Sequence, residues 1–340
     1  MTHVRIVRRV GPRFSLDVDF DIGPGTTAIY GCYGAGKTVL LETIAGFAQP
    51  DSGRLLLNDA ILFDAESHVQ LPPHLRHCGF VSQAPSLFPH MTVRQNLAFA
   101  AHRWPRLERH RRVAEVLDKF NLTAAASTWP RGLDTPAKLR CSVARALVAE
   151  PRLLLLDESD IGVSLLRQIR EATKAPILLA TADLDLCCAA DQLLLLDAGR
   201  ILQRGAPRDV LDRPASLEAA RLLGVPNLFQ ATIAALDPVR NSSRLEFDHF
   251  TLTGPYVPGH LKGDRVWVAA AAESLRLQSG SAQSPNTVTV GLVRATDRTH
   301  NVLLEFSAGI FVAVSHEEFA GRQESEEWRV EFPPEALRVF

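Results

Sequence analysis

The chain has 340 residues, of which 46% are hydrophobic and 22% are charged, which is enough for one large domain and a small one. Its formal net charge of -1, with acidic and basic residues interspersed, predicts that nucleic acid is not a partner, because no extended basic face is available. No apolar run approaches the ~20 residues of a membrane span and the N-terminus lacks the basic-then-apolar order of a signal peptide, so we expect a cytoplasmic protein that meets the membrane through a partner.

The first predicted elements are strands that lead into a glycine-rich loop. Residues Phe14–Ile22 alternate apolar and polar side chains without a break, which predicts a strand with one buried face. A turn at residues 23–25 precedes a short buried strand over 27–30, and the loop that follows opens an apolar helix over 39–45. Two further elements follow, a hairpin over 55–63 and a buried strand over 79–82.

The middle of the chain predicts a helical insert followed by a return of buried strands. From residue 93 to about 147 the apolar side chains recur at helical spacing, with Val113, Val116 and Leu117 as examples. Buried strands then alternate with helix-length segments, which is typical of a parallel sheet in a doubly wound α/β domain. These strands are predicted over 153–156, 177–179 and 193–196.

Past about residue 225 the helices give way to short strands broken by Gly, Pro, Ser and Asn, which predicts a small all-β barrel. We therefore expect two domains, residues 1–225 and 226–340, with a helical subdomain at about 86–147 in the first. The predicted barrel strands are 266–268, 287–290, 302–306 and 310–314.

The glycine-rich loop fits the pattern G-x4-G-K-[ST] of a phosphate-binding loop. Its glycines allow the backbone N–H groups to point at phosphate oxygens, at the positive end of the following helix. Lys37 would neutralise the β- and γ-phosphates of a nucleotide, and the Thr38 hydroxyl would coordinate Mg²⁺. The alternative, a glycine-rich turn without function, is disfavoured by the strand before it and the helix after it. The predicted nucleotide-binding residues are Gly31, Cys32, Tyr33, Gly34, Ala35, Gly36, Lys37, Thr38 and Val39.

Two carboxylates follow the buried strand over 153–156 and would complete this site. We predict that Asp157 holds Mg²⁺ and that Glu158 acts as the general base on the attacking water. Two acidic residues after an apolar strand are by themselves more often ordinary solvent-facing loop residues. The phosphate loop in the same chain favours the functional interpretation instead.

The five cysteines, Cys32, Cys78, Cys141, Cys187 and Cys188, lack metal-ligand spacing and suit reduced thiols. Cys32 lies inside the phosphate loop, so its alkylation would block nucleotide by steric hindrance.

Residues 81–83, 87–93 and 96–99 resemble the Q-loop and the start of the helical subdomain in the ATPase subunits of ABC importers. The resemblance implies that Gln83 reaches Mg²⁺ and the attacking water. It also implies that Leu87, Phe88 and Met91 receive a coupling helix of a membrane subunit; the alternative for these three is a plain hydrophobic core. The implied partners are membrane permease subunits on the inner face of the plasma membrane, a second ATP-binding subunit in a homodimer or heterodimer, and, indirectly, a periplasmic solute-binding protein.

The C-terminal region resembles the regulatory TOBE/MOP-like barrel of such importers, through residues 227–229 and 332–340, with the sulfate and molybdate types nearest. The implied fold class is α/β, a P-loop NTPase (RecA-like) core with antiparallel β and helical subdomains plus a small C-terminal all-β (OB-like/TOBE) barrel.

Three segments depart from the family pattern. The signature Leu-Ser-Gly-Gly-Gln is replaced by residues 133–137, where Asp134 brings negative charge and Pro136 removes an N–H donor. An Asp before Pro also predicts a self-capped helix start. The family's γ-phosphate histidine is Ala182, which can neither donate nor accept, and the D-loop is Gly162-Val163-Ser164.

Two functional hypotheses follow. The resemblance implies a subunit that couples Mg-ATP binding and hydrolysis to import of a small solute, with an oxyanion such as sulfate or molybdate nearest. Losing one preorganised transition-state contact typically costs ~10²- to 10³-fold in rate. The alternative is therefore a catalytically impaired pseudo-ATPase that binds ATP in a structural or regulatory role.

Overall fold

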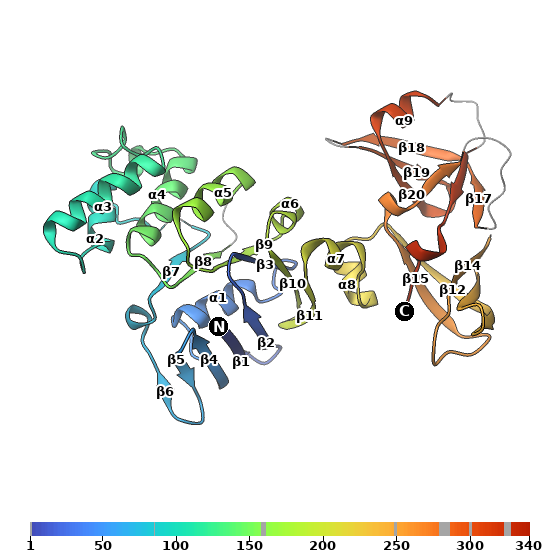
Figure 1. The fold of residues 1–340 in the computed structure, drawn as a ribbon, viewed down its shortest axis with the longest axis horizontal. Helices are drawn as coiled ribbons and strands as arrows, with labels where there is room; N and C mark the ends of the chain where they lie inside the picture. The colour runs from blue at the N-terminus through green and yellow to red at the C-terminus, as the bar shows by residue number, and fades with distance from the viewer. Residues whose placement is uncertain are drawn as a thin grey trace. The chain divides into compact units, whose positions relative to one another are not determined.

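The computed structural model describes residues 2–84, 86–157, 161–247, 250–278, 286–298, 301–322 and 328–340. The chain divides into two compact units, residues 1–210 and 211–340 (Figure 1). The first unit contains two hydrophobic clusters and the second unit contains one.

One sheet organises the first unit, and its eleven strands run in the order β6-β5-β4-β1-β2-β11-β10-β3-β9-β8-β7 within the described residues. The strands β10, β3, β9, β8 and β7 are parallel neighbours. The strands β1, β2, β4, β5 and β6 pair antiparallel. The strand bounds are β1 Thr2–Val10, β2 Phe14–Ile22, β3 Thr26–Tyr30, β4 Ser52–Leu57, β5 Ala60–Asp64, β6 Val69–Gln70, β7 Cys78–Val81, β8 Leu153–Asp157, β9 Ile177–Thr181, β10 Gln192–Asp197 and β11 Arg200–Gly205.

Strand β8 shows why the parallel part of the sheet is apolar on both faces. Leu153 and Leu155 belong to the cluster that contains helix α1 (Lys37–Ala45). Leu154 and Leu156 belong to the cluster on the opposite face, with helices α4 (Thr135–Val148) and α5 (Val163–Ala172). Because successive side chains point to opposite faces, an unbroken apolar strand requires a layer on each side.

The predicted helical insert is present as helices α2 (Val93–Ala100), α3 (Arg106–Lys119) and α4 (Figure 1). Thr92 starts α2 with a capping box, since its side chain accepts from the Gln95 amide and Gln95 accepts from the Thr92 amide. The shorter helices are α6 (Leu184–Cys188), α7 (Pro207–Asp212), α8 (Leu217–Leu222) and α9 (His316–Ala320). Among the described residues, none of the helices combines the length and apolar character required to cross a membrane.

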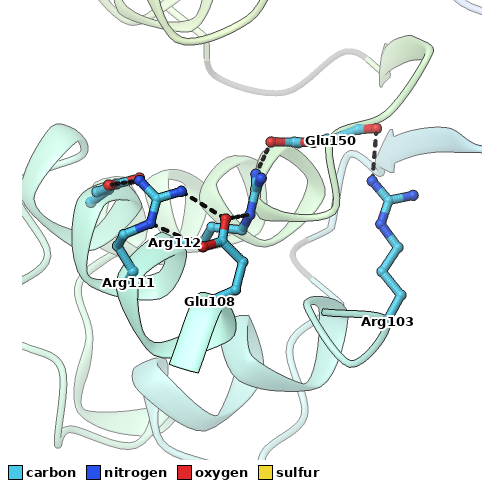
Figure 2. Close-up of polar contacts among 6 residues, drawn as sticks. Arg103, Glu108, Arg111, Arg112 and Glu150 are labelled. Carbon is cyan, nitrogen blue, oxygen red and sulfur yellow. Dashed lines mark hydrogen bonds and ion pairs between the residues drawn. The ribbon is translucent and has the colours of Figure 1, made fainter. Parts of the chain in front are cut away.

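A charged network ties the first turns of α3 to the end of α4 (Figure 2). Glu108 accepts from Arg111 at 2.7 Å and from Arg112 at 2.6 Å. Arg112 also pairs with Glu150, and its guanidinium lies 3.8 Å from the centre of the Trp104 ring. Exposed ion pairs contribute little individually, and this network links α3 to Glu150, just after the end of α4.

The second unit is built mainly of strands, in sheets of order β14-β13-β12-β15-β22, β16-β21-β17 and β18-β19-β20 within its described residues. Buried side chains such as Val268, Phe306 and Phe332 form its core. Asn227 fixes the start of β12, because its amide donates to the Phe311 carbonyl at 2.8 Å and its carbonyl accepts from the Phe311 amide at 2.7 Å. The bounds are β12 Asn227–Asp237, β13 Ser242–Glu246, β14 Thr251–Pro255, β15 Arg265–Ala270, β16 Arg276–Gln278, β17 Thr287–Val290, β18 Leu292–Asp297, β19 Val302–Phe306, β20 Ile310–Val314, β21 Trp328–Glu331 and β22 Arg338–Val339.

Candidate functional site

The parallel strands bring four separate chain segments to one edge of the sheet. Tyr30 at the end of β3 pairs with Thr181 at the end of β9. Asp157 at the end of β8 pairs with Ala180, and Val81 at the end of β7 pairs with Leu156. The glycine-rich loop, Gln83, Asp157 and Ala182 therefore follow neighbouring carboxyl ends, which is where open α/β sheets bind ligands.

The loop after β3 is wrapped around the ammonium group of Lys37. This side chain is only 4% exposed, and its Nζ donates to the carbonyl oxygens of Gly31 at 2.7 Å and Cys32 at 3.2 Å. A Cβ at Gly31 would lie 2.4 Å from the Leu196 carbonyl oxygen, so this position requires glycine. Gly36 has a φ of 106° and would meet the Phe14 ring in the same way.

Helix α1 begins at Lys37, two residues before the predicted helix start, because Gly36 already serves as its N-cap. No side chain caps this end and its first turn carries no acidic residue. The amides of Lys37, Thr38 and Val39 precede the first intrahelical donor, the Leu40 amide, which bonds to the Gly36 carbonyl at 2.9 Å. Backbone N–H groups at the start of a helix, together with the helix dipole, form the arrangement that binds phosphate.

The side chains of the loop differ in what they can contribute. Tyr33 is 97% exposed and Cys32 is exposed, whereas Ala35 is buried at 3%. Gly34 has a φ of 84° with open space where a Cβ would stand. The loop is therefore equipped to bind through its backbone, and Cys32 and Tyr33 offer no buried side-chain contact of their own.

The residues that would hold a magnesium ion are close together. The Thr38 hydroxyl lies 3.1 Å from the Asp157 carboxylate, and Asp157 is 3% exposed. Two neighbouring ligands of an octahedral Mg²⁺ are about 2.9 Å apart when each lies about 2.0–2.1 Å from the ion. Among the described residues, no group of three or more His, Cys, Asp or Glu side chains could hold a metal. This hydroxyl and carboxylate pair suits a cation that is shared with substrate phosphates.

Of the two residues predicted to act in catalysis, only Gln83 lies in the part of the chain that the structure describes. Gln83 is exposed on the segment after β7, at the same edge as the phosphate loop. Glu158 lies outside the described residues.

A buried asparagine that the sequence analysis did not assign to the site shapes the segment after Gln83. Asn96 is 0% exposed in α2, and its carbonyl accepts from the Phe88 amide at 2.8 Å. Its amide group donates to the carbonyls of Phe88, Met91 and Thr92. In the sequence, the signal for the role of this asparagine is a polar side chain placed between apolar positions of a helix. The Phe88 ring meets that of Phe99 at 4.8 Å, and Phe99 is 53% exposed.

The segment at the signature position forms the predicted self-capped helix start. Asp134 is the N-cap of α4, and its carboxylate accepts from the Ala137 amide at 2.7 Å. Pro136 occupies the first turn and supplies no N–H. At the N-terminus of α4, the Asp134 carboxylate therefore satisfies the Ala137 amide and places a negative charge at this end of the helix.

The segment after β9 has an alanine where the family pattern has a histidine. Ala182 follows β9 and precedes Asp183, whose carboxylate caps α6 by accepting from the Asp185 amide at 2.8 Å. Helix α5 begins directly after its N-cap Gly162.

The chain is similar to known proteins both over the residues of the candidate site and over most of its length. The model of the ABC transporter family matches residues 16–160. The molybdenum import ATP-binding protein of Rhodospirillum rubrum is 35% identical over 224 residues, 63% of this chain and 60% of that protein, so this alignment spans less than two thirds of that relative. The spermidine/putrescine import ATP-binding protein of Vibrio cholerae is 33% identical over 319 residues, 88% of this chain and 81% of that protein.

A solved structure shows the same fold. It is that of cbiO1 from Clostridium perfringens, part of an ABC transporter complex, with a TM-score of 0.54 and 24% identity. The superposition covers 65% of this chain and 94% of that one. This confirms the predicted α/β P-loop NTPase core, and the second unit contains the small all-β sheets that the sequence predicts.

Proposed function

Because the chain belongs to the importer-type ATP-binding subunits of the ABC transporter family, we propose that it binds Mg-ATP at the carboxyl edge of its parallel strands and drives solute import through membrane subunits. ATP and Mg²⁺ are the cofactors of this family. The observation that carries the proposal is the loop from Gly31 to Gly36, closed around Lys37 at the uncapped start of α1.

Each part of the loop has a role in this proposal. The amides from Cys32 to Val39 hold the β- and γ-phosphates, and Lys37 turns from its two carbonyl acceptors to the phosphate oxygens. Thr38 and Asp157 hold Mg²⁺, which supplies charge neutralisation across the β- and γ-phosphate oxygens. The geometry supports this assignment, because the hydroxyl and the carboxylate are already neighbours.

For hydrolysis we assign Glu158 as the general base and Gln83 as the residue that orients the water and reaches Mg²⁺. The support is positional, since Glu158 directly follows Asp157 and Gln83 follows the adjacent strand β7.

The alternative function is a pseudo-ATPase that binds Mg-ATP without useful turnover, in a structural or regulatory role. It is favoured by the Asp134 carboxylate, which already occupies the Ala137 amide, and by Ala182 at the end of β9. The residues proposed to bind nucleotide are unaffected by either change, so binding and turnover are separable.

We further propose the partners and the place of action. Phe88, with Leu87 and Met91, would receive a coupling helix of a membrane permease on the inner face of the plasma membrane, supported by the exposed Phe99 beside it. A second ATP-binding subunit, in a homodimer or heterodimer, and a periplasmic solute-binding protein would complete the importer. The second unit would be the TOBE-like regulatory barrel. A small oxyanion such as molybdate or sulfate is the proposed solute, supported by the molybdenum import relative.

A phosphate-release assay separates the two functions. The purified chain would be assayed alone and with its candidate permease, beside Glu158→Gln and the control Glu115→Gln on the exposed face of α3. Turnover lost only in Glu158→Gln establishes the ATPase. Bound Mg-ATP without turnover establishes the pseudo-ATPase, and absence of Mg-ATP binding excludes both.

A further inference from the structure

A strongly basic surface lies where the chain passes from α2 into the first two turns of α3. Residues 103–112 contain five arginines and one glutamate, an excess of four positive charges, whereas the whole chain has a formal net charge of -1. Four exposed side chains of this segment form the surface that we call the α3 patch, namely Arg103, Arg106, Leu107 and Arg111.

Carboxylates neutralise only part of this charge. Glu108 pairs with both Arg111 and Arg112 (Figure 2). Arg111 also pairs with Glu115, and Arg112 also pairs with Glu150. Even when these three carboxylates are counted, two positive charges remain in excess.

The other three arginines of the segment pair with no carboxylate in the part of the chain that the structure describes. Arg103 donates to a main-chain carbonyl at 3.3 Å, and Arg109 donates to two main-chain carbonyls at 3.2 and 3.1 Å. Arg106 is exposed at the first position of α3, where the positive end of the helix dipole adds to its charge. Because a neutral carbonyl cannot cancel a guanidinium charge, Arg103 and Arg106 can attract an external anion.

An apolar side chain lies among these charges. Leu107 is 86% exposed in the first turn of α3. It follows Arg106 directly and shares a helix face with Arg111, four residues further on. Single exposed apolar side chains are common, but a leucine between arginines on an exposed helix face is typical of segments that rest on an anionic membrane surface.

The composition of the α3 patch favours a lipid surface over a protein partner. A stable protein interface buries about 800 Å² on each partner around an apolar core, whereas Leu107 is the single apolar member of the α3 patch. At a bilayer surface, arginines meet anionic headgroups and an apolar side chain enters the boundary of the acyl chains.

The α3 patch also adjoins the surface assigned to the membrane permease. The ring of His102 lies 6.4 Å from that of Phe99, which in turn contacts Phe88 at 4.8 Å. A permease helix held at Phe88 would keep residues 103–111 near the bilayer. This argument about position rests on the proposed function, whereas the charge and exposure of the α3 patch do not.

We propose that the α3 patch binds the headgroup layer of a bilayer that contains anionic lipids. Arg103 and Arg106 contact the anionic headgroups, and Leu107 enters the boundary of the acyl chains. The contact adds a direct attachment of this chain to the membrane beside the one that a permease would provide.

Vesicle flotation of the intact chain, without permease or nucleotide, tests the proposal. We expect binding to vesicles of equimolar phosphatidylcholine and phosphatidylserine, weakened by added salt, and no binding to pure phosphatidylcholine. Arg103→Gln/Arg106→Gln should weaken binding by about 20-fold, since each arginine contributes about 5-fold. Leu107→Gln should weaken it at least ~5-fold.

Arg240→Gln/Arg244→Gln is the matched control, because it removes the same charge from exposed positions of the β12–β13 hairpin in the second unit. It should leave vesicle binding unchanged. Circular dichroism checks that each variant is folded, and Arg106 and Leu107 are exposed, so their substitution leaves the core intact.

Wild-type chain that binds no vesicles, or binds pure phosphatidylcholine equally well, would overturn the proposal. Unchanged binding in folded Arg103→Gln/Arg106→Gln, or an equal loss in the control, would also overturn it. If the chain ignores vesicles but the same variant loses a detergent-solubilised permease, the α3 patch contacts protein instead of lipid. Lys37→Ala should bind vesicles as wild type does, so a failure here is distinguishable from a failure of the nucleotide site.

Discussion

Arg145 of α4 donates from Nη1 to the carbonyl of Ser86 at 2.8 Å and from Nη2 to its hydroxyl at 3.3 Å, across 59 residues of sequence. Its guanidinium also lies 5.5 Å from the centre of the Phe88 ring. Burial lowers the pKa of Arg145 from its usual value, but an arginine remains charged at neutral pH. The helix that carries Asp134 therefore also holds the segment that follows Gln83.

This contact predicts that Arg145→Ala loosens the segment after Gln83. Losing two hydrogen bonds from a charged donor should speed amide exchange in a peptide covering residues 86–92 by about 10-fold or more. Arg145→Lys keeps the charge and should retain part of the protection. Hydrogen exchange with mass spectrometry measures this, with Arg106→Ala as the control. Equal exchange in wild type and Arg145→Ala would contradict the positioning role.

The Asp134 cap predicts a specific stability change. Asp134→Ala leaves the Ala137 amide without its acceptor and should lower the free energy of unfolding by ~1 kcal/mol, within the usual 0.5–2 kcal/mol of an N-cap loss. Asp134→Ser keeps a capping oxygen and should change it by only a few tenths. Urea unfolding followed by helical circular dichroism tests this. A loss in Asp134→Ser as large as that in Asp134→Ala would rule out the cap as the cause.

Buried thiols predict a loss of stability in alkali. Burial raises the pKa of Cys141 to about 11 and that of Cys187 to about 12, and both are 0% exposed. The unfolded thiols ionise first, so their contribution is full below pH ~9 and decreases as pH rises toward 11–12, by up to ~1.4 kcal/mol per pH unit for each thiol. Unfolding of wild type and of Cys141→Ala/Cys187→Ala between pH 8 and pH 10.5 provides the test. The variant should show the shallower slope, and an unchanged slope would exclude these thiols.

Cys32 predicts a nucleotide footprint on thiol labelling. It is exposed inside the phosphate loop, whereas Cys188 is exposed elsewhere and serves as an internal control. Bound Mg-ATP should slow maleimide labelling of Cys32 by about 10-fold or more at saturation, because the modified thiol needs the space that the phosphates occupy. Labelling of Cys188 should not change, and protection should disappear in Lys37→Ala. If Mg-ATP slowed the labelling of Cys32 and Cys188 equally, nucleotide in the phosphate loop would not be the cause of the protection.

Much of the first unit is predictable because its signals are local. The alternation in Phe14–Ile22 indicates a strand with one buried face, and the apolar run before Asp157 indicates a strand that is buried on both faces. Both strands are present in the structure. The phosphate loop is likewise contained in eight consecutive residues. In contrast, the local sequence around the expected boundary between residues 225 and 226 does not show why β12 begins at Asn227. Its buried amide is explained by Phe311, a partner distant in sequence.

Other elements carry no local pattern. All side chains of β18 (Leu292–Asp297) are exposed, so no apolar face marks this strand, and it forms through its ladder with β19. The contact between Arg145 and Ser86 and the bonds from Asn96 to the segment after Gln83 depend on tertiary packing. Patterns in the sequence therefore predict strands and loops whose residues are consecutive. Contacts between distant segments of the chain at the site become visible only in the folded structure.

Isothermal titration of Mg-ATP into the intact chain tests the central claim most directly. We expect a saturable heat with one nucleotide per chain, and an affinity at least ~10-fold weaker in Lys37→Ala, because the ammonium group enclosed by Gly31 and Cys32 is lost. A titration without heat, or an affinity that Lys37→Ala leaves unchanged, would contradict the assignment of this loop as the nucleotide site.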